Sequence, residues 1–416
     1  MAKGVFEDIK VADFSWAAAG PMCTRYLADY GATVVRVESH IKPDQGRTAS
    51  PFAERKPGIN RSMFFGRFHP NKYGVSFNLQ NPKGQELAHK LISWADIVVE
   101  SFSPGVIKRL ELDYESVKEA RPDLIYLSTS AQGQWGPHSH TRGYGHHAVA
   151  LAGWPDVSGW SDRAPSPPYG AYGDFISARF AAASIMAALE YRRRTGKGQW
   201  IDQSQVETSL HFLSPLVMDY MTNGKAAVRQ GNRLPYAAPH GVYPCKGDDL
   251  WIAICVFTEE EWEVFCHVMD DISWTKEPRF TTLAKRKENE DELDRLVGKW
   301  TLLHTPHEVE SMMQAAGVAA HIVDKSSDLF QDPQLKHRGY FVRLPHSEMG
   351  NPAYERQTCC LLSKTPAKLS MPSPCLGEHN EYVCKEFLGL TDDGISDYIV
   401  EGAITVEGGE EFRFSI

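Results

Sequence analysis

The first 130 residues alternate short apolar runs with amphipathic stretches, and this alternation limits the fold more than any other feature. Residues 33–37 (TVVRV) are β-branched and few, as in a strand, whereas residues 83–94 carry Leu87, Leu91 and Ile92 at helical spacing. A repeated order of strand, helix and strand favours a doubly wound α/β layer around a parallel sheet. Ligands of such sheets bind at the carboxyl ends of the strands. The other expected strands are residues 9–14, 74–79, 97–99 and 124–127.

The rest of the chain predicts a second, smaller α/β domain. Residues 133–173 are rich in Gly, Pro, His, Trp and Ser and are expected to form a loop. Residues 174–194 form the strongest predicted helix, and residues 203–221 a second one. The expected division is a large Rossmann-like domain from residues 1–221 and 345–416, linkers at 222–245 and 325–344, and a small domain at 246–324.

Charge and composition exclude several classes of protein. There are 44 Lys and Arg against 53 Asp and Glu, so a net charge of −9 gives no overall attraction to nucleic acid or to an anionic membrane. The richest apolar segment, residues 180–189, is too short to span a bilayer. The eight cysteines form no CxxC pair and are expected to be reduced, packed thiols. With no signal-peptide stretch at the start of the sequence, the expected compartment is the cytoplasm.

Asp174 lies where a glycine-bearing loop, residues 168–173, meets the start of the strongest predicted helix. On the residues alone, a helix N-cap is the favoured interpretation, because an aspartate there accepts a backbone N–H and interacts well with the helix dipole. The same position also suits a nucleophile. The helix terminus keeps the carboxylate ionised, and flanking glycines let a substrate approach closely.

Several segments, in order and at characteristic spacing, identify a family that the chain resembles. The chain is similar to the class III CoA-transferases, which include formyl-CoA transferase and carnitine CoA-transferase and share their fold with α-methylacyl-CoA racemase. The resemblance runs from about Val11 to Glu381. It rests on residues 11–14, 19–21 and 31–38, Asp44 with Arg47, and residues 71–72, 95–105, 142–144, 173–174, 195–199 and 376–379.

The resemblance implies a mechanism in which Asp174 is the catalytic residue. It would attack a donor acyl-CoA, form an aspartyl–acyl anhydride and then an aspartyl-CoA thioester, and pass CoA to a free carboxylic acid. The resemblance to this family suggests succinyl-CoA as the donor. CoA would be a substrate, with no tightly bound cofactor and no metal. The resemblance also implies an interlocked homodimer, with a heteromer of paralogous subunits as the other arrangement.

Residues that would bind CoA follow from the same resemblance. Cations suit the CoA phosphates, and a flat apolar side chain suits the adenine. The candidates are Arg109, Lys72, Arg142 and Arg47 for phosphates, Ala17, Ala18 and Ala19 for the thioester end, Phe102 for the adenine side, and Tyr144 in the loop before the catalytic helix.

The chain departs from the family pattern at three places. Ser39 and His40 follow Glu38 where a basic residue is common, which leaves His40 or Lys42 as substitutes for that phosphate contact. The consecutive glycines of formyl-CoA transferase have no counterpart near residues 232–241, so oxalate is not the expected acceptor. Gly145 stands where an acidic residue is common, so the acceptor pocket is expected to be particular to this chain.

Two other functions remain open. A racemase needs a second acid/base group, usually a His in this loop, but Tyr144 occupies that position and only a shifted alignment restores His146 or His147. Either of these histidines is also a candidate to line the acceptor pocket. The second alternative is a CoA-binding subunit without activity of its own. His138, His140, His146 and His147 form a loose cluster, but no cysteine or carboxylate set completes a metal site, so loop histidines are favoured.

Overall fold

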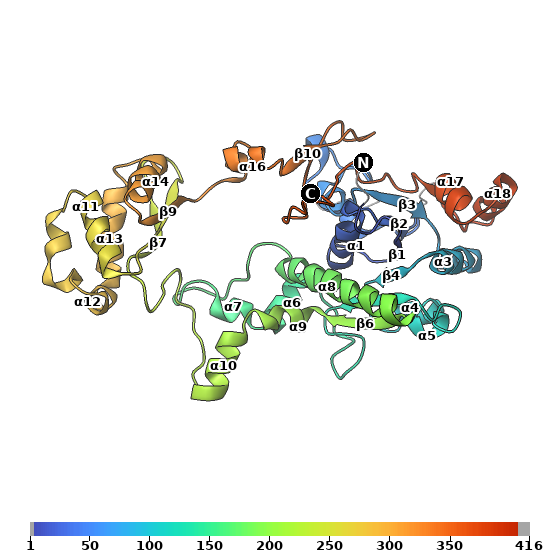
Figure 1. Ribbon diagram of the computed structural model, residues 1–416, viewed down its shortest axis with the longest axis horizontal. Helices are drawn as coiled ribbons and strands as arrows, with labels where there is room; N and C mark the ends of the chain where they lie inside the picture. The colour runs from blue at the N-terminus through green and yellow to red at the C-terminus, as the bar shows by residue number, and fades with distance from the viewer. Residues whose placement is uncertain (1–3, 407–416) are drawn as a thin grey trace. The chain divides into compact units, whose positions relative to one another are not determined.

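The computed structural model describes residues 4–406 and divides into two compact units (Figure 1). The larger unit contains a six-stranded sheet in the order β3-β2-β1-β4-β5-β6, and every neighbouring pair is parallel. This arrangement confirms the predicted α/β, Rossmann-like fold. Its strands are β1 (Lys10–Asp13), β2 (Thr33–Glu38), β3 (Lys72–Ser76), β4 (Ile97–Glu100), β5 (Ile125–Ser130) and β6 (Gln199–Ser204).

Both faces of this sheet are buried, because successive side chains of a strand point to opposite faces. Val11 of β1 packs in a core with α1 (Ala19–Asp29) and α8 (Tyr172–Thr195). The next residue, Ala12, belongs to the opposite core, which includes α3 (Pro82–Trp94) and α18 (Asp392–Val400). The strand order reverses between β1 and β4, so the chain leaves these two strands in opposite directions and opens a crevice beyond their carboxyl ends.

Shorter elements connect and extend this unit. After β3 and β4 come α3 and the two turns α4 (Val106–Arg109) and α5 (Tyr114–Val117). No helix among the described residues is both long and apolar enough to cross a membrane. The remaining elements of this unit are η1 (Gln45–Thr48), η2 (Ala53–Arg55), α2 (Met63–Gly66), α6 (Gly145–Leu151), α9 (Gln205–His211), α10 (Ser214–Asn223), β10 (Phe341–Arg343), β11 (Ala353–Glu355), α17 (Asn380–Tyr382) and η5 (Val383–Phe387). Two further short helices, α7 (Trp154–Val157) and α16 (Pro333–His337), lie mostly in the smaller unit.

Two local predictions were wrong. The expected loop at 133–173 contains the helices α6 and α7, and the expected helix at 203–221 is the end of strand β6 followed by α9 and α10. The strand was missed because β6 is an edge strand that carries polar and half-buried residues, and so shows no apolar run. After α9 ends at His211, Pro215 lies in the first turn of α10, where a proline is tolerated.

The smaller unit is built around an antiparallel sheet in the order β7-β8-β9. Aromatic and aliphatic side chains of its helices cover the sheet, among them Trp262, Phe265 and Val297. The sheet consists of β7 (His240–Pro244), β8 (Trp251–Cys255) and β9 (Ala319–Ile322), and the other elements are α11 (Glu259–Val268), η3 (Ser273–Lys276), η4 (Pro278–Phe280), α12 (Leu283–Glu288), α13 (Glu290–Thr301), α14 (Pro306–Ala315) and α15 (Ser326–Leu329).

The boundaries of the two units differ from the expected division. The smaller unit comprises Pro155–Ser166 and Lys225–Lys336, so it includes most of both predicted linkers and a segment assigned to the large domain. Glycines and prolines around Gly231 and Pro235 suggested a linker at 222–245, yet β7 lies within it and pairs with β8. Because β7 starts beside glycines and prolines, its apolar run is too short to be recognised as a strand in the sequence.

Candidate active site

A cavity of about 530 Å³ lies in the larger unit, beyond the carboxyl ends of the parallel strands. Segments that follow β1, β2, β3, β4 and β5 all contribute to its wall, as the reversal of strand order between β1 and β4 requires. More of its wall is apolar than polar. The residues that line the cavity include Trp16, Ala17, Ala19, Lys42, Gln45, Phe102, Arg142, Tyr144, Asp174 and Gln205.

Asp174 lines this cavity from the first turn of α8, with only 8% of its surface exposed. Its Oδ1 accepts a hydrogen bond from Gln205 Nε2 at 2.9 Å. The helix begins two residues earlier than predicted, at Tyr172, and its N-cap residue is Ala171. The N-cap interpretation of Asp174 is therefore wrong, and its carboxylate is left to face the cavity.

Two glycines make room for this carboxylate. A Cβ atom on Gly145, at the start of α6, would lie 2.2 Å from Asp174 Oδ2. A Cβ atom on Gly173 would lie 2.8 Å from the Gly145 carbonyl oxygen. Any side chain at Gly145 would therefore displace the carboxylate. This contact gives a physical reason for the Gly at position 145, where the family pattern often has an acidic residue.

Burial raises the pKa of Asp174 from 3.8 to about 6. Hydrogen bonds from Gln205 and from the Gly145 backbone N–H oppose this shift, as does the nearby His146. Among the described residues, no lysine or arginine forms an ion pair with this carboxylate. Asp174 is thus ionised at neutral pH yet more basic than an ordinary aspartate. A carboxylate in that state is suited to act as a nucleophile.

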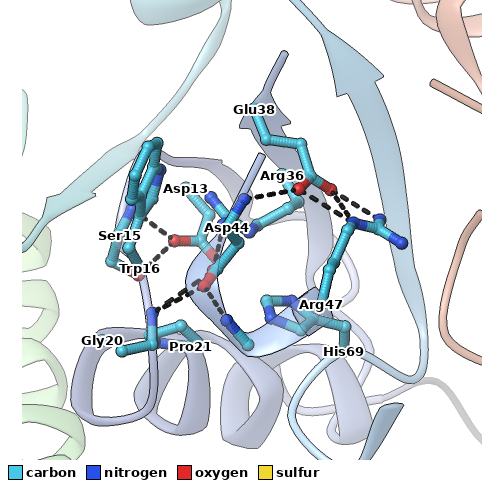
Figure 2. A network of polar contacts seen from close by, with 12 residues as sticks. Asp13, Ser15, Trp16, Gly20, Pro21, Arg36, Glu38, Asp44, Arg47 and His69 are labelled. Carbon is cyan, nitrogen blue, oxygen red and sulfur yellow. Dashed lines mark hydrogen bonds and ion pairs between the residues drawn. The ribbon is translucent and has the colours of Figure 1, made fainter. Parts of the chain in front are cut away.

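Lys72 and Arg47, two of the cations predicted to bind CoA phosphates, are not on the cavity wall. The Lys72 ammonium is fully buried and bonds Asp13 Oδ2 at 3.0 Å, the Pro21 carbonyl oxygen at 2.8 Å and Thr24 Oγ1 at 2.7 Å. Figure 2 shows the Arg47 guanidinium against the carboxylate of Glu38, whose two oxygens accept from Nε at 3.0 and 2.9 Å. Because both cations are buried and already paired, we correct this prediction: they stabilise the fold beneath the cavity.

The buried charges around Asp44 shape one wall of the cavity (Figure 2). The Asp44 carboxylate is ion-paired with Arg36 and accepts the Ala17 N–H, with both oxygens 3.2 Å from the nitrogen. Ala17 has a φ of +63°, a left-handed conformation that is uncommon for a residue with a side chain. The neighbouring Trp16 N–H donates to Ser101 Oγ at 2.8 Å. The ion pair thus holds the β1–α1 loop in an otherwise unfavourable shape.

The other predicted residues lie on or near the cavity. Ala17, Ala19, Phe102, Arg142 and Tyr144 line it, whereas Ala18 is buried behind the loop. Arg109 is exposed on α4, and Val106, which begins that helix, lines the cavity.

Sequence analysis missed several lining residues. Lys42, considered only as a substitute, lines the cavity with its Nζ 5.7 Å from the Trp16 ring centroid. Gln205, Gln45 and Trp16 were not singled out at all. The polar run at residues 203–205, at the start of the helix predicted for 203–221, is the signal that could have revealed Gln205.

The histidines of this region do not form a metal centre. His147 Nδ1 accepts the Tyr144 backbone N–H at 3.1 Å, so this side chain closes the first turn of α6. His146 and His147 are exposed, and neither is among the residues that line the cavity. Across residues 4–406 there is no group of three or more His, Cys, Asp or Glu side chains that could hold a metal ion.

Comparison with known proteins places the chain in a family. The model of CoA-transferase family III matches residues 6–380. The succinyl-CoA–D-citramalate CoA-transferase of Chloroflexus aurantiacus is 31% identical over 94% of this chain and 96% of its own. The succinate–glutarate CoA-transferase of Agrobacterium fabrum is 29% identical over 91% of this chain and 94% of its own. A CaiB/BaiF family protein from Brucella suis has a crystal structure that matches with a TM-score of 0.85 and 28% identity, over 92% of this chain and all of its own.

The chain therefore belongs to CoA-transferase family III, and its enzyme class is that of a CoA-transferase. The likeness covers the parallel sheet, the loops around the cavity and the helix that carries Asp174.

Proposed function

We propose that this enzyme moves CoA from succinyl-CoA to a small dicarboxylic acid through covalent intermediates on Asp174. The observation that carries the proposal is a nearly buried carboxylate that faces the cavity at the strand ends of a family III CoA-transferase and forms no ion pair with a lysine or arginine of the described residues. The donor and the class of acceptor are taken from similar enzymes, whose names include succinyl-CoA with D-citramalate and succinate with glutarate.

The proposed reaction proceeds in four steps. The Asp174 carboxylate attacks the thioester carbonyl of succinyl-CoA, and CoA leaves as a thiolate, which gives a mixed anhydride. The thiolate attacks the aspartyl carbonyl of this anhydride and releases succinate, which leaves an aspartyl-CoA thioester. The acceptor carboxylate attacks that thioester and expels the thiolate again, to form a second anhydride. Finally, the thiolate attacks the acyl carbonyl, which gives the new acyl-CoA and restores the Asp174 carboxylate.

The surroundings of Asp174 support this chemistry. Its position in the first turn of α8 places the carboxylate near the positive end of the helix dipole. Gln205 Nε2 and the Gly145 backbone N–H fix the orientation of its two oxygens. Its low exposure keeps water from the reactive anhydride and thioester. Ala17, Ala19 and Phe102 provide a wall for the pantetheine and adenine parts of CoA, with Arg109 and Lys42 as the phosphate-binding cations.

An exchange experiment with an Asp174→Ala variant tests the proposal. Wild-type enzyme is incubated with succinyl-CoA and labelled glutarate, and the acyl-CoA products are identified by mass spectrometry. We expect transfer to fall by at least about 10⁴-fold in the variant, because every step passes through this carboxylate. When hydroxylamine is added to wild-type enzyme together with acyl-CoA, it should convert Asp174 into a hydroxamate. The same wild-type enzyme without acyl-CoA should not be modified.

An exposed aspartate provides the matched control. Asp248→Ala removes a carboxylate from the surface of the smaller unit and should leave transfer unchanged. Substantial transfer by Asp174→Ala would contradict the proposed mechanism. Deuterium incorporation into a 2-methylacyl-CoA in D₂O, without any transfer to free acids, would instead favour a racemase.

We also infer that the enzyme assembles as a homodimer, as the family resemblance implies. The exposed face of α10 supports this, since it carries large apolar side chains that a monomer would leave in water, among them Met218, Tyr220 and Met221.

A further inference from the structure

Arg142 is a cation without a partner on the wall of the cavity. It lines the cavity and is exposed, and within residues 4–406 no hydrogen bond or ion pair reaches its side chain. The carboxylates of the neighbouring wall, Glu38 and Asp44, are already engaged by Arg47 and Arg36. Because Glu38 and Asp44 already have cationic partners, the guanidinium N–H groups of Arg142 remain available to bind a ligand.

The position of Arg142 along the chain places it near the reacting end of the cavity. Gly145, whose Cβ would collide with the Asp174 carboxylate, lies three residues further on. Since consecutive Cα atoms are about 3.8 Å apart, the Cα atoms of Arg142 and Gly145 are separated by at most about 11 Å. The side chain of an arginine spans much of such a distance. In CoA, by contrast, the long pantetheine arm separates the thioester from the phosphates.

The Tyr144 side chain joins the loop that carries Arg142 to another part of the cavity wall. Tyr144 Oη donates to Gln45 Oε1 at 2.6 Å, so the loop that carries Arg142 meets the segment that carries Lys42. Both partners of this hydrogen bond line the cavity. This contact holds the loop that carries Arg142 against the cavity wall, in the same cavity that Asp174 lines.

We propose that Arg142 binds the far carboxylate of a dicarboxylic acyl group while its thioester lies at Asp174. A planar guanidinium binds a carboxylate through two parallel hydrogen bonds, which a monocarboxylic acyl chain cannot offer. The Tyr144 hydroxyl, on the same loop as Arg142, marks the boundary of the subsite. This inference rests on the proposed CoA transfer. It assigns Arg142 to substrate selection rather than to the CoA phosphates.

The test compares two donors that differ only at the far end of the acyl chain. Succinyl-CoA ends in a carboxylate and butyryl-CoA ends in a methyl group, and both are offered to wild type and to Arg142→Gln with the same acceptor. We expect kcat/KM for succinyl-CoA to fall about 10- to 150-fold, the range for losing a charged hydrogen bond, with butyryl-CoA changed less than about threefold. The affinity for free CoA, measured by calorimetry, should stay within about twofold of wild type.

Arg109→Gln is the matched contrast, because Arg109 is also an exposed arginine beside the cavity. It should weaken free CoA and both donors by the same factor, as expected for a phosphate contact. If Arg142→Gln behaves in that way, or leaves both donors unchanged, the far-carboxylate subsite is refuted. Failure of the CoA transfer itself would look different, since wild type would then transfer CoA from neither donor.

Discussion

Two carboxylates of the larger unit are almost equally buried but have opposite surroundings. Asp13 ends β1 and lies against the Lys72 ammonium. Asp174 lies in the first turn of α8 and has no ion pair with a lysine or arginine of the described residues. Burial alone would raise the pKa of Asp13, but Lys72, Arg36 and the hydroxyls of Ser15 and Thr24 outweigh it and hold that pKa below 3.8. At Asp174 burial prevails, and the pKa rises to about 6.

The cations repeat this contrast. Lys72 is buried and bonded to three oxygens, whereas Arg142 faces the cavity and has no hydrogen-bond or ion-pair partner within residues 4–406. Asp13 and Lys72, which serve the fold, compensate each other's charge within the chain. Where charges serve a ligand, their compensation is left to the substrate. A buried acid with a raised pKa and an unpaired cation on one cavity are together a stronger sign of function than either alone.

The largest effect on stability is expected when the buried ion pair of Asp13 and Lys72 is broken. Asp13→Asn removes the charge that neutralises Lys72 and leaves a buried ammonium with only neutral oxygens. We expect the free energy of unfolding at pH 7.5 to fall by about 3 to 5 kcal/mol, as for other broken buried ion pairs. Urea denaturation followed by circular dichroism measures this change.

The control for Asp13 is an aspartate with no buried partner. Asp248→Asn alters an exposed side chain and should change the free energy of unfolding by less than about 0.5 kcal/mol. The assignment of Lys72 to the fold would be abandoned if Asp13→Asn cost less than about 1 kcal/mol.

A smaller loss, in activity and not in stability, is expected at the uncompensated site. Gly145→Ala places a methyl group 2.2 Å from Asp174 Oδ2, so the carboxylate must move by about an ångström to restore van der Waals contact. A displacement of that size costs a well-aligned nucleophile about 10²-fold in kcat/KM. Steady-state transfer assays check this value. Gly298→Ala in α13, where a Cβ has 3.7 Å of space, is the control and should keep full activity; equal activity of both variants would contradict the tight contact at Gly145.

Sequence patterns were enough to predict the sheet and the helix that begins near Asp174. Strands such as β2 and β4 are buried on both faces, so their apolar runs are continuous and easily recognised. The edge strand β6 was missed because four of its six residues, Gln199, Asp202, Gln203 and Ser204, are polar and interrupt any apolar run. The boundary of the smaller unit was misplaced because β7 lies among glycines and prolines typical of a linker.

The site was predicted only in part, because a family motif names positions without their partners. Arg142 matches the family pattern less well than Lys72 does, yet of Lys72, Arg47 and Arg142 only Arg142 lines the cavity. What separates them is the tertiary contacts with Asp13 and Glu38, which lie 59 and 9 residues away in the sequence. Gln205 was missed for a similar reason, since its role depends on a hydrogen bond to Asp174 across 31 residues.

The last and smallest effect is a gain of stability at Asp174, opposite in sign to the loss at Asp13. The unfolded chain has an ordinary aspartate with a pKa of 3.8, and folding raises this pKa to about 6. Between these values the folded state binds more protons than the unfolded state, so wild-type stability from this group falls as pH rises from about 4 to 6 and the cost is complete above pH 6. Two pKa units correspond to at most about 3 kcal/mol.

Asp174→Asn removes that cost, although its amide can satisfy only one of the two donors that now bond the carboxylate, Gln205 and the Gly145 N–H. We therefore expect this variant to be inactive but about 1 to 2 kcal/mol more stable than wild type at pH 7.5. The advantage should shrink toward zero near pH 4, where the unfolded wild-type carboxyl also becomes protonated. Paired urea titrations at the two pH values measure it. A variant less stable than wild type at pH 7.5 would mean that Asp174 is compensated in the folded protein as fully as Asp13, and the contrast between the two carboxylates would not hold.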